Sequence, residues 1–228
     1  MKVTILLFDR VTALDAIGPY EVLSRVPGWE LEFAAVEAGP VRTDTGITTI
    51  GATRSISEID STDILLIPGG PGSRQLMSDE PTLEWLRAVA AGADWTASVC
   101  TGSLVLAAAG LLDGKRCTTH WLYLERLREL GAVPVAERVV VDGDTITAAG
   151  VSSGIDMALS LVGRVCGPEL AQTIQLGIEY DPQPPYESGS PRTAPARDGR
   201  AGHLDLRRRG PVARREAGGA LEPVPAGS

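Results

Sequence analysis

The chain has 228 residues, 43% of them hydrophobic, which is enough to bury the core of one large domain or two small ones. Its net charge of −8 argues against a nucleic-acid-binding surface, and no apolar run reaches the ~18 residues that a membrane span requires. The three cysteines are odd in number and lack metal-ligand spacing, so we expect reduced thiols, no metal site and a cytoplasmic protein.

Apolar runs alternate with helical patterns along the chain. In chain order we expect a strand (3–8), a helix (13–26), strands (31–36 and 63–68), a helix (about 79–92), a strand (95–99), a helix (about 102–109), a hairpin (138–150) and two helices (about 151–166 and 168–179). The hairpin is indicated by two short apolar runs joined by Asp142 and Gly143. Strands that are continuously apolar and alternate with helices predict an α/β fold, with a mainly parallel sheet covered on both faces.

The domain organisation follows from composition. No linker or repeat occurs before about residue 181, so we expect residues 1–180 to form one α/β domain, with 181–196 as a C-terminal extension. Residues 197–228 hold seven arginines against four acidic residues, with no Ile, Met, Phe, Trp or Tyr. A segment with so little to bury is expected to be disordered or divergent.

Cys100 directly follows the apolar strand "WTASV" and precedes a helix that opens with Thr101. A strand-to-helix turn of this kind is the geometry of a nucleophile elbow. The N–H groups and dipole of the following helix stabilise a thiolate, and so favour a lowered pKa for the thiol. The alternative is a small buried core thiol, and position alone leaves both open.

Two further segments follow the carboxyl ends of other predicted strands, at the same edge of the sheet as Cys100. Ligands of open parallel sheets bind at this edge. Asp15 lies in the apolar segment "TALDAIGPY", where a carboxyl tends to have a raised pKa and can transfer protons. Its simpler role is an acid at a helix N-terminus, held by backbone N–H groups. Gly69 and Gly70 could aim N–H donors at a bound group or form a plain tight turn.

Other candidates are weaker. His120 is the only histidine outside the tail, so it is the sole partner available for a Cys–His pair, but we expect a structural or pocket-edge position before a helical pattern. Cys117 and Cys166 lack the elbow context and are expected to be structural. Asp156 lies on an amphipathic helix, where an acid is more often solvated or capping than catalytic.

Four segments together resemble the ThiJ/PfpI superfamily, and within it the isonitrile hydratases: "PGGPG", "SVCTGSLVLAAAGLLDGKRCTTHW", "ERVVVDGDTITAAGVSSGIDMALSLV" and "EYDPQPPYESGSPRTAPA". The resemblance covers about residues 3–196. It implies a flavodoxin-like three-layer sandwich with a mainly parallel sheet and a nucleophile elbow, similar to class I glutamine amidotransferases.

The resemblance also implies an activity. Cys100 matches the family nucleophile, Asp15 the essential acid and Thr101 a third active-site residue. The implied reaction is the hydration of an isonitrile to an N-substituted formamide through a cysteine thioimidate, by a homodimer without metal or organic cofactor. Three residues would contact the substrate or intermediate: Gly69, Gly70 and His120.

Two other functions remain open. One is a ligand- or redox-sensing domain like those fused to AraC-type regulators, although nothing after residue 196 resembles a helix-turn-helix region. The other is a different cysteine-dependent activity of the superfamily. Its peptidases and deglycase-like members often carry histidine after the nucleophile or glutamate in the acid position, where this chain has Thr101 and Asp15.

Overall fold

The computed structural model describes residues 1–195, so the expectation for the arginine-rich segment lies outside the described residues. Residues Met1–Pro184 form one compact unit, and a second unit begins at Pro185. The described part of that second unit, 185–195, consists of turns and bends. Among residues 1–195, no helix combines the length and apolar character needed to cross a lipid bilayer.

A seven-stranded sheet forms the centre of the first unit, in the order β10-β11-β7-β6-β1-β2-β5. Its strands are β1 (Lys2–Leu6), β2 (Glu30–Ala35), β5 (Arg54–Ser55), β6 (Ile64–Ile67), β7 (Trp95–Val99), β10 (Val139–Asp142) and β11 (Thr145–Ala148). All neighbouring strands run parallel except β10 and β11. The predicted, mainly parallel sheet is therefore confirmed.

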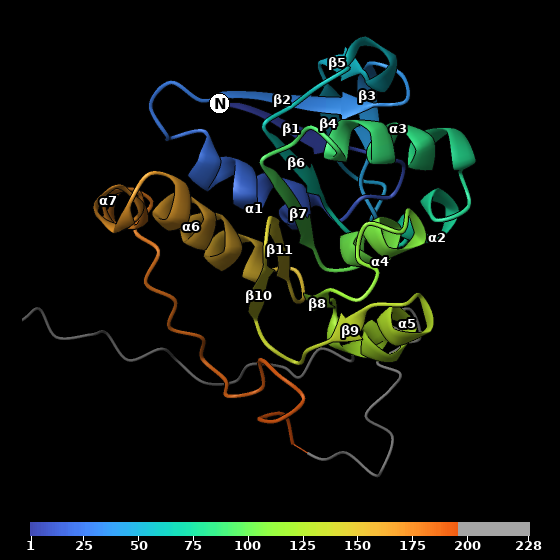
Figure 1. Ribbon diagram of the computed structural model, residues 1–228. Coiled ribbons are helices and arrows are strands. Elements are labelled where there is room, and N and C mark those ends of the chain that lie inside the picture. Colours follow the sequence, from blue (N-terminus) through green and yellow to red (C-terminus); the bar gives the residue numbers. More distant parts are fainter. Residues whose placement is uncertain (196–228) are drawn as a thin grey trace, which may run out of the picture. The chain divides into compact units, whose positions relative to one another are not determined.

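Helices cover both faces of this sheet (Figure 1). One face carries α1 (Ala13–Leu23) and α6 (Ser153–Val165), with α7 (Pro168–Gly177) packed on α6. The other face carries α2 (Ser73–Leu76), α3 (Glu80–Ala90) and α4 (Gly102–Ala108). The arrangement confirms the predicted three-layer α/β sandwich.

The inner strands are buried on both faces, which explains their unbroken apolar sequence. In β6 all four residues, Ile64–Ile67, are fully buried, and Ile5 of the neighbouring β1 is equally inaccessible. Full burial of one such side chain contributes about 1.5–3 kcal/mol to folding. These strands therefore form the rigid layer from which the loops at their carboxyl ends project.

The predicted hairpin is present, but its loop lies one residue further along the chain. Asp142 pairs with Thr145 at the end of the ladder, so Gly143 and Asp144 form the two-residue loop. Gly143 has a φ of +59°, which glycine adopts without strain. The loop begins at Gly143 because its first residue takes a positive φ, while Asp142 still belongs to the strand.

Several short elements were not predicted. They are the hairpin β3 (Gly39–Arg42) and β4 (Thr49–Ala52), the pair β8 (Arg116–Cys117) and β9 (Val133–Pro134), α2, β5 and the 3-10 turns at Ile56–Glu58 and Trp121–Tyr123, the last followed by α5 (Leu124–Glu129). Each is two to six residues long, which is too short for hydrophobic periodicity to identify it.

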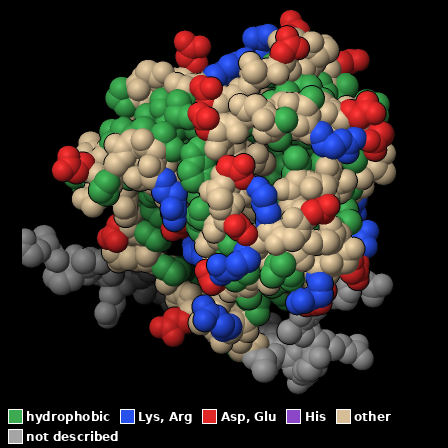
Figure 2. All heavy atoms as spheres, viewed as in Figure 1, with side chains coloured by type: hydrophobic (Ala, Val, Ile, Leu, Met, Phe, Trp, Pro, Cys, Tyr) green, Lys and Arg blue, Asp and Glu red, His purple; other side chains and the backbone are tan. Residues whose placement is uncertain are grey.

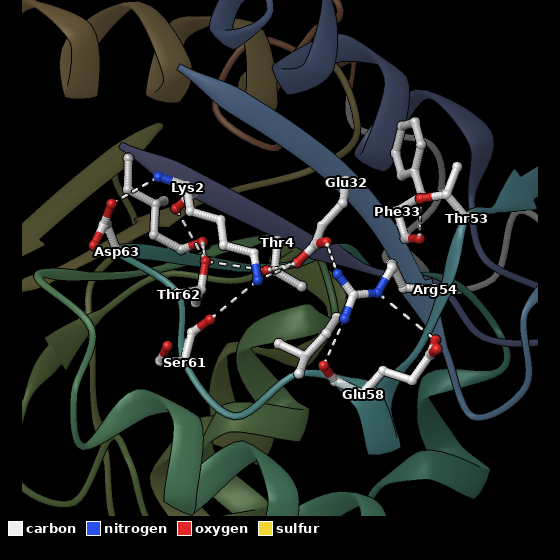
Figure 3. A network of polar contacts seen from close by, with 12 residues as sticks. Lys2, Thr4, Glu32, Phe33, Thr53, Arg54, Glu58, Ser61, Thr62 and Asp63 are labelled. Carbon is white, nitrogen blue, oxygen red and sulfur yellow. Dashed lines mark hydrogen bonds and ion pairs between the residues drawn. The ribbon is translucent and has the colours of Figure 1, made fainter. Parts of the chain in front are cut away.

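A polar network ties the amino-terminal side of the sheet together (Figure 3). Glu32 of β2 is largely buried and accepts from Lys2 Nζ at 3.1 Å, Arg54 NH1 at 3.5 Å and Thr4 Oγ1 at 2.9 Å. Asp63, just before β6, accepts from the Lys2 backbone N–H at 2.6 Å. The network joins β1, β2, β5 and β6 at the end of the sheet away from the strands' carboxyl ends.

Charges on the outer surface are mixed in sign. Figure 2 shows Lys and Arg side chains interspersed with Asp and Glu over the face in view. Exposed ion pairs such as Arg126–Glu129 contribute about 0–1 kcal/mol each. The stability of this fold therefore comes mainly from its apolar layers.

Close packing at the start of α4 generates a testable prediction. A Cβ added to Gly102 would overlap the carbonyl oxygen of Ile67 at the end of β6. We expect Gly102→Ala to lower the free energy of unfolding by about 1–3 kcal/mol, measured by urea denaturation, although alanine favours helix. Gly92→Ala is the matched control, because its added Cβ meets nothing within 4 Å. Equal stability of the two variants would contradict the prediction.

Candidate active site

The segments after β1, β6 and β7 meet at the carboxyl edge of the sheet, as predicted. The Gly69 N–H, after β6, donates to Oδ2 of Asp15, in the first turn of α1, at 3.0 Å. A Cβ on Gly69 would lie 2.8 Å from Asp15 Oδ2 and 2.8 Å from Thr101 Oγ1. Asp15 and Thr101 therefore converge on Gly69, and Cys100 directly precedes Thr101.

Cys100 has the backbone conformation of a nucleophile elbow. Its φ is +56°, a left-handed value that costs a non-glycine residue roughly 1–3 kcal/mol. The Cys100 N–H donates to the carbonyls of Ala148 and Ala149 at 3.1 and 2.8 Å. Its carbonyl accepts from Ser103 Oγ at 3.0 Å and Thr119 Oγ1 at 2.8 Å. Hydrogen bonds on both sides thus hold the strained turn.

The Cys100 thiol is 6% exposed, and its surroundings favour the neutral form. Burial raises the pKa of the thiol well above its ordinary value, and the negative charge of Asp15 raises it further. The backbone N–H groups of Thr101 and Val151 face the thiol and lower its pKa, but by less. The predicted lowering of this pKa was therefore wrong, because loss of water outweighs the start of a seven-residue helix.

Asp15 is fully buried, and burial raises the pKa of its carboxyl to about 7. The hydrogen bond from the Gly69 N–H and the nearby Cys100 thiol oppose this rise in pKa, and the charge of Asp44 adds to it. Oδ1 of Asp15 has no hydrogen-bond partner in the part of the chain that the structure describes. The predicted raised pKa is confirmed, and one carboxyl oxygen is buried without a hydrogen-bond partner among the described residues.

The Thr101 hydroxyl binds the glycine turn after β6. Thr101 Oγ1 accepts from the Gly70 N–H at 2.9 Å and from Ser73 Oγ at 3.0 Å. Ser73 Oγ also lies 2.8 Å from the Gly70 carbonyl oxygen. The sequence analysis missed Ser73, although it directly follows the quoted "PGGPG" segment. These contacts lock the glycine turn to the elbow.

The two glycines bind side chains of the site through their N–H groups. Gly69 donates to Asp15 and Gly70 to Thr101, so neither N–H is free in this structure. Gly70 has a φ of +138°, and an added Cβ would lie 2.5 Å from the Arg10 carbonyl oxygen. Only glycine fits such a turn. The N–H groups that face the Cys100 sulfur belong instead to Thr101 and Val151.

His120 lies at the edge of this cluster. A Cβ on Gly150 would come within 3.0 Å of His120 Cδ2, which places the imidazole beside the residue before Val151. Its Nδ1 accepts from the Leu122 N–H at 3.4 Å, and burial lowers the pKa of the ring. No hydrogen bond joins His120 to Cys100 or Asp15. Thr119, the preceding residue in "CTTHW", is the one that bonds Cys100, and the motif could have indicated it.

The remaining cysteines lie outside the cluster. Cys117 is buried on β8, and burial together with the charge of Asp142 raises the pKa of its thiol to about 11. Cys166 is exposed at the end of α6. Among residues 1–195, no three His, Cys, Asp or Glu side chains gather closely enough to hold a metal ion.

Two surface hollows lie elsewhere on the molecule. One, of about 410 Å³, is lined by residues between Gly72 and Asp79 together with Phe8 and Asp9. The other, of about 300 Å³, lies beside β10. Neither is lined by Cys100 or Asp15. Cys100 and Asp15 are themselves buried.

Known proteins resemble this chain over most of its length. The isonitrile hydratase of Pseudomonas putida is 46% identical over 196 residues, which cover 86% of each chain. A solved ThiJ/PfpI family protein from Pseudomonas syringae superposes with a TM-score of 0.83 at 37% identity, covering 85% of this chain and 81% of that one. An HTH-type transcriptional regulator from Pseudomonas aeruginosa is 30% identical over 169 residues, 72% of this chain, but this chain spans only 49% of the regulator's length.

The identity with the hydratase extends over most of both chains, so this protein is an enzyme of the hydratase type. Residues 1–164 match the model of the DJ-1/PfpI family, and the solved structure agrees in fold. The chain therefore belongs to the DJ-1/PfpI family.

Proposed function

We propose that this enzyme hydrates isonitriles, R–N≡C, to N-substituted formamides, R–NH–CHO. The observation that carries the proposal is a buried carboxyl with a pKa of about 7 beside a buried cysteine thiol. A carboxyl titrating there can both accept and donate a proton near neutral pH. The 46% identical relative named isonitrile hydratase supports the choice of substrate.

In the first step, the Cys100 sulfur bonds to the terminal carbon of the isonitrile. Asp15, as the carboxylate, accepts the thiol proton and passes it to the same carbon. The product is a thioimidate, Cys–S–CH=N–R, in which the S–H proton has become the C–H proton. The N–H groups of Thr101 and Val151 face the sulfur and stabilise the negative charge that develops on it.

In the second step, water adds to the carbon of the thioimidate and a proton moves to nitrogen. The carbon then carries a hydroxyl group, the R–NH group and the sulfur. The C–S bond breaks, the hydroxyl proton returns to Cys100 through Asp15, and the formamide leaves. The net reaction is the addition of one water molecule to the isonitrile.

Residues around these two groups hold them in position. Gly69 orients Asp15, whose unpaired Oδ1 is the oxygen available for proton transfer. Thr101 and Gly70 hold the elbow turn, and His120 lies at the edge where the R group of the substrate would extend. The reacting N≡C end of an isonitrile is linear and one atom wide, which suits a cysteine residue that is 6% exposed.

The first prediction concerns the nucleophile. Cys100→Ser should lower formamide production from cyclohexyl isocyanide by about three orders of magnitude or more, because the attacking atom is lost. The assay follows the formamide by chromatography. Cys166→Ser is the matched control, since its thiol is exposed and remote from the site, and it should retain normal turnover. No turnover by folded wild type would contradict the proposal and favour the sensing function.

The second prediction concerns the proton carrier. Asp15→Asn keeps the shape and the Gly69 contact but cannot take the thiol proton, so kcat/KM should fall about 10²–10⁴-fold. For the wild type, kcat/KM should rise as pH increases through about 7, where Asp15 ionises, and then level off, because the thiol pKa is raised. Near-normal turnover by the variant would remove Asp15 from the mechanism.

The third prediction concerns the stability of the same variant. The pKa of Asp15 rises from 3.8 to about 7 on folding, so the folded chain retains a proton that the unfolded chain releases. This contribution to stability is present below pH 3.8, declines as pH rises to about 7 and is lost above it. Asp15→Asn should therefore be more stable than wild type at pH 8, by up to about 4 kcal/mol.

Urea denaturation at pH 5 and pH 8 tests the direction in which pH changes the stability difference between Asp15→Asn and wild type. The advantage of the Asp15→Asn variant should be larger at pH 8, where the buried carboxylate of the wild type is ionised. A stability difference that does not change between these pH values would show that ionisation of Asp15 is not its cause.

A further inference from the structure

The loop between β11 and α6, residues 149–152, contacts Cys100 at two points. The Ala149 carbonyl accepts from the Cys100 N–H at 2.8 Å. The Val151 N–H faces the Cys100 thiol. Since one contact fixes the backbone of the elbow and the other reaches the sulfur, the position of this loop sets the surroundings of the reacting atom.

Arg138, in the segment before β10, holds the same loop from its other side. Its carbonyl accepts from the Ala149 N–H at 2.9 Å. Its guanidinium donates through NH2 to Ser152 Oγ at 3.3 Å. One residue thus binds the loop at both ends, through its main chain at Ala149 and through its side chain at Ser152.

Two more side chains fix the guanidinium. Asp156 of α6 accepts from Arg138 Nε at 2.8 Å, and the Tyr180 hydroxyl, after α7, donates to the same Asp156 oxygen at 3.0 Å. Half of the Arg138 side chain is exposed, and an arginine so placed is not held by burial. The three residues, which we call the Arg138 cluster, therefore depend on one another for their geometry.

We propose that Arg138 is a positioning residue for the chemistry of Cys100, and that Asp156 and Tyr180 hold it in the conformation that keeps loop 149–152 against the elbow. The proposal deepens the function proposed above and rests on it for the reaction concerned. No member of the cluster bonds to the sulfur. The guanidinium reaches the loop through Ser152, and Asp156 and Tyr180 act through the guanidinium.

Displacement of loop 149–152 should slow each step in which the Cys100 sulfur carries negative charge. When Asp15 takes the thiol proton, the Val151 N–H faces the charge that develops on Cys100. The same N–H faces the sulfur again when the C–S bond breaks. Hydrogen bonds to charged groups are stronger than those between neutral groups, so displacing the loop should slow reactions of the sulfur about tenfold.

The rate of Cys100 alkylation by iodoacetamide in the full-length protein measures this effect directly. Peptide-resolved mass spectrometry separates modification of Cys100 from that of the exposed Cys166. We expect Arg138→Gln to lower the alkylation rate of Cys100 about tenfold and Tyr180→Phe, which removes one hydroxyl, about two- to threefold. Arg126→Gln removes an arginine from an exposed ion pair away from the loop and should leave the rate unchanged.

Two further variants separate positioning from general loosening. Arg138→Lys keeps the charge but not the planar fork, so it should restore part of the rate that Arg138→Gln loses. Arg138→Gln combined with Asp156→Asn should be no slower than Arg138→Gln alone, because the residues act as one unit. If the two substitutions lowered the alkylation rate by factors that multiply, the mutual dependence of Arg138 and Asp156 would be contradicted.

The outcomes are distinct. A folded Arg138→Gln variant, judged by circular dichroism, that alkylates Cys100 as fast as or faster than wild type would overturn the proposal, since mere opening of the site speeds access. If Arg138→Gln fails to fold, Tyr180→Phe decides by the same criterion. Slower alkylation without any isonitrile turnover by wild type would uphold the positioning role and refute the proposed reaction.

Discussion

Removal of water from one carboxyl and one thiol is the constraint on which this site depends. Burial places the pKa of Asp15 at about 7 and raises the pKa of the Cys100 thiol, and the proposed chemistry uses the proton that these two groups can exchange. The rest of the edge supports that arrangement. Gly69 holds one carboxyl oxygen, and the other is buried without a hydrogen-bond partner among the described residues. The fold destabilises the charged carboxylate, and that same destabilisation suits Asp15 to the proton transfer proposed for it near neutral pH.

Crowding at the edge of the sheet explains the backbone that surrounds these groups. The turn after β6 passes so close to the start of α1 and the elbow that Gly69 and Gly70 have no room for side chains. Gly102 is pressed against the end of β6 for the same reason. Cys100 cannot be glycine, so it takes up a left-handed conformation that hydrogen bonds on both sides must hold. A strained backbone at Cys100 and the absence of side chains at the glycines thus both follow from close packing at this edge.

The architecture could be predicted from the sequence because the central strands are continuously apolar and helices α3 and α6 are strongly periodic. Sequence reasoning also predicted that Asp15, Gly69 and Cys100 meet, since parallel strands bring their carboxyl ends to one edge. It failed on the pKa of Cys100, because the degree of burial is a property of packing and not of the turn. It missed Ser73 and the Val151 N–H, since a hydroxyl and a backbone group carry no signal until the loops that bear them are in place.

A protonated, buried thiol has a consequence for the life of the enzyme in an oxidising environment. Peroxides and other electrophiles react with thiolates, and the neutral form of Cys100 offers them little of that species. In the proposed mechanism the sulfur becomes nucleophilic only while Asp15 withdraws its proton. Under the proposed mechanism, the raised pKa of the thiol therefore slows oxidation of Cys100 between catalytic cycles.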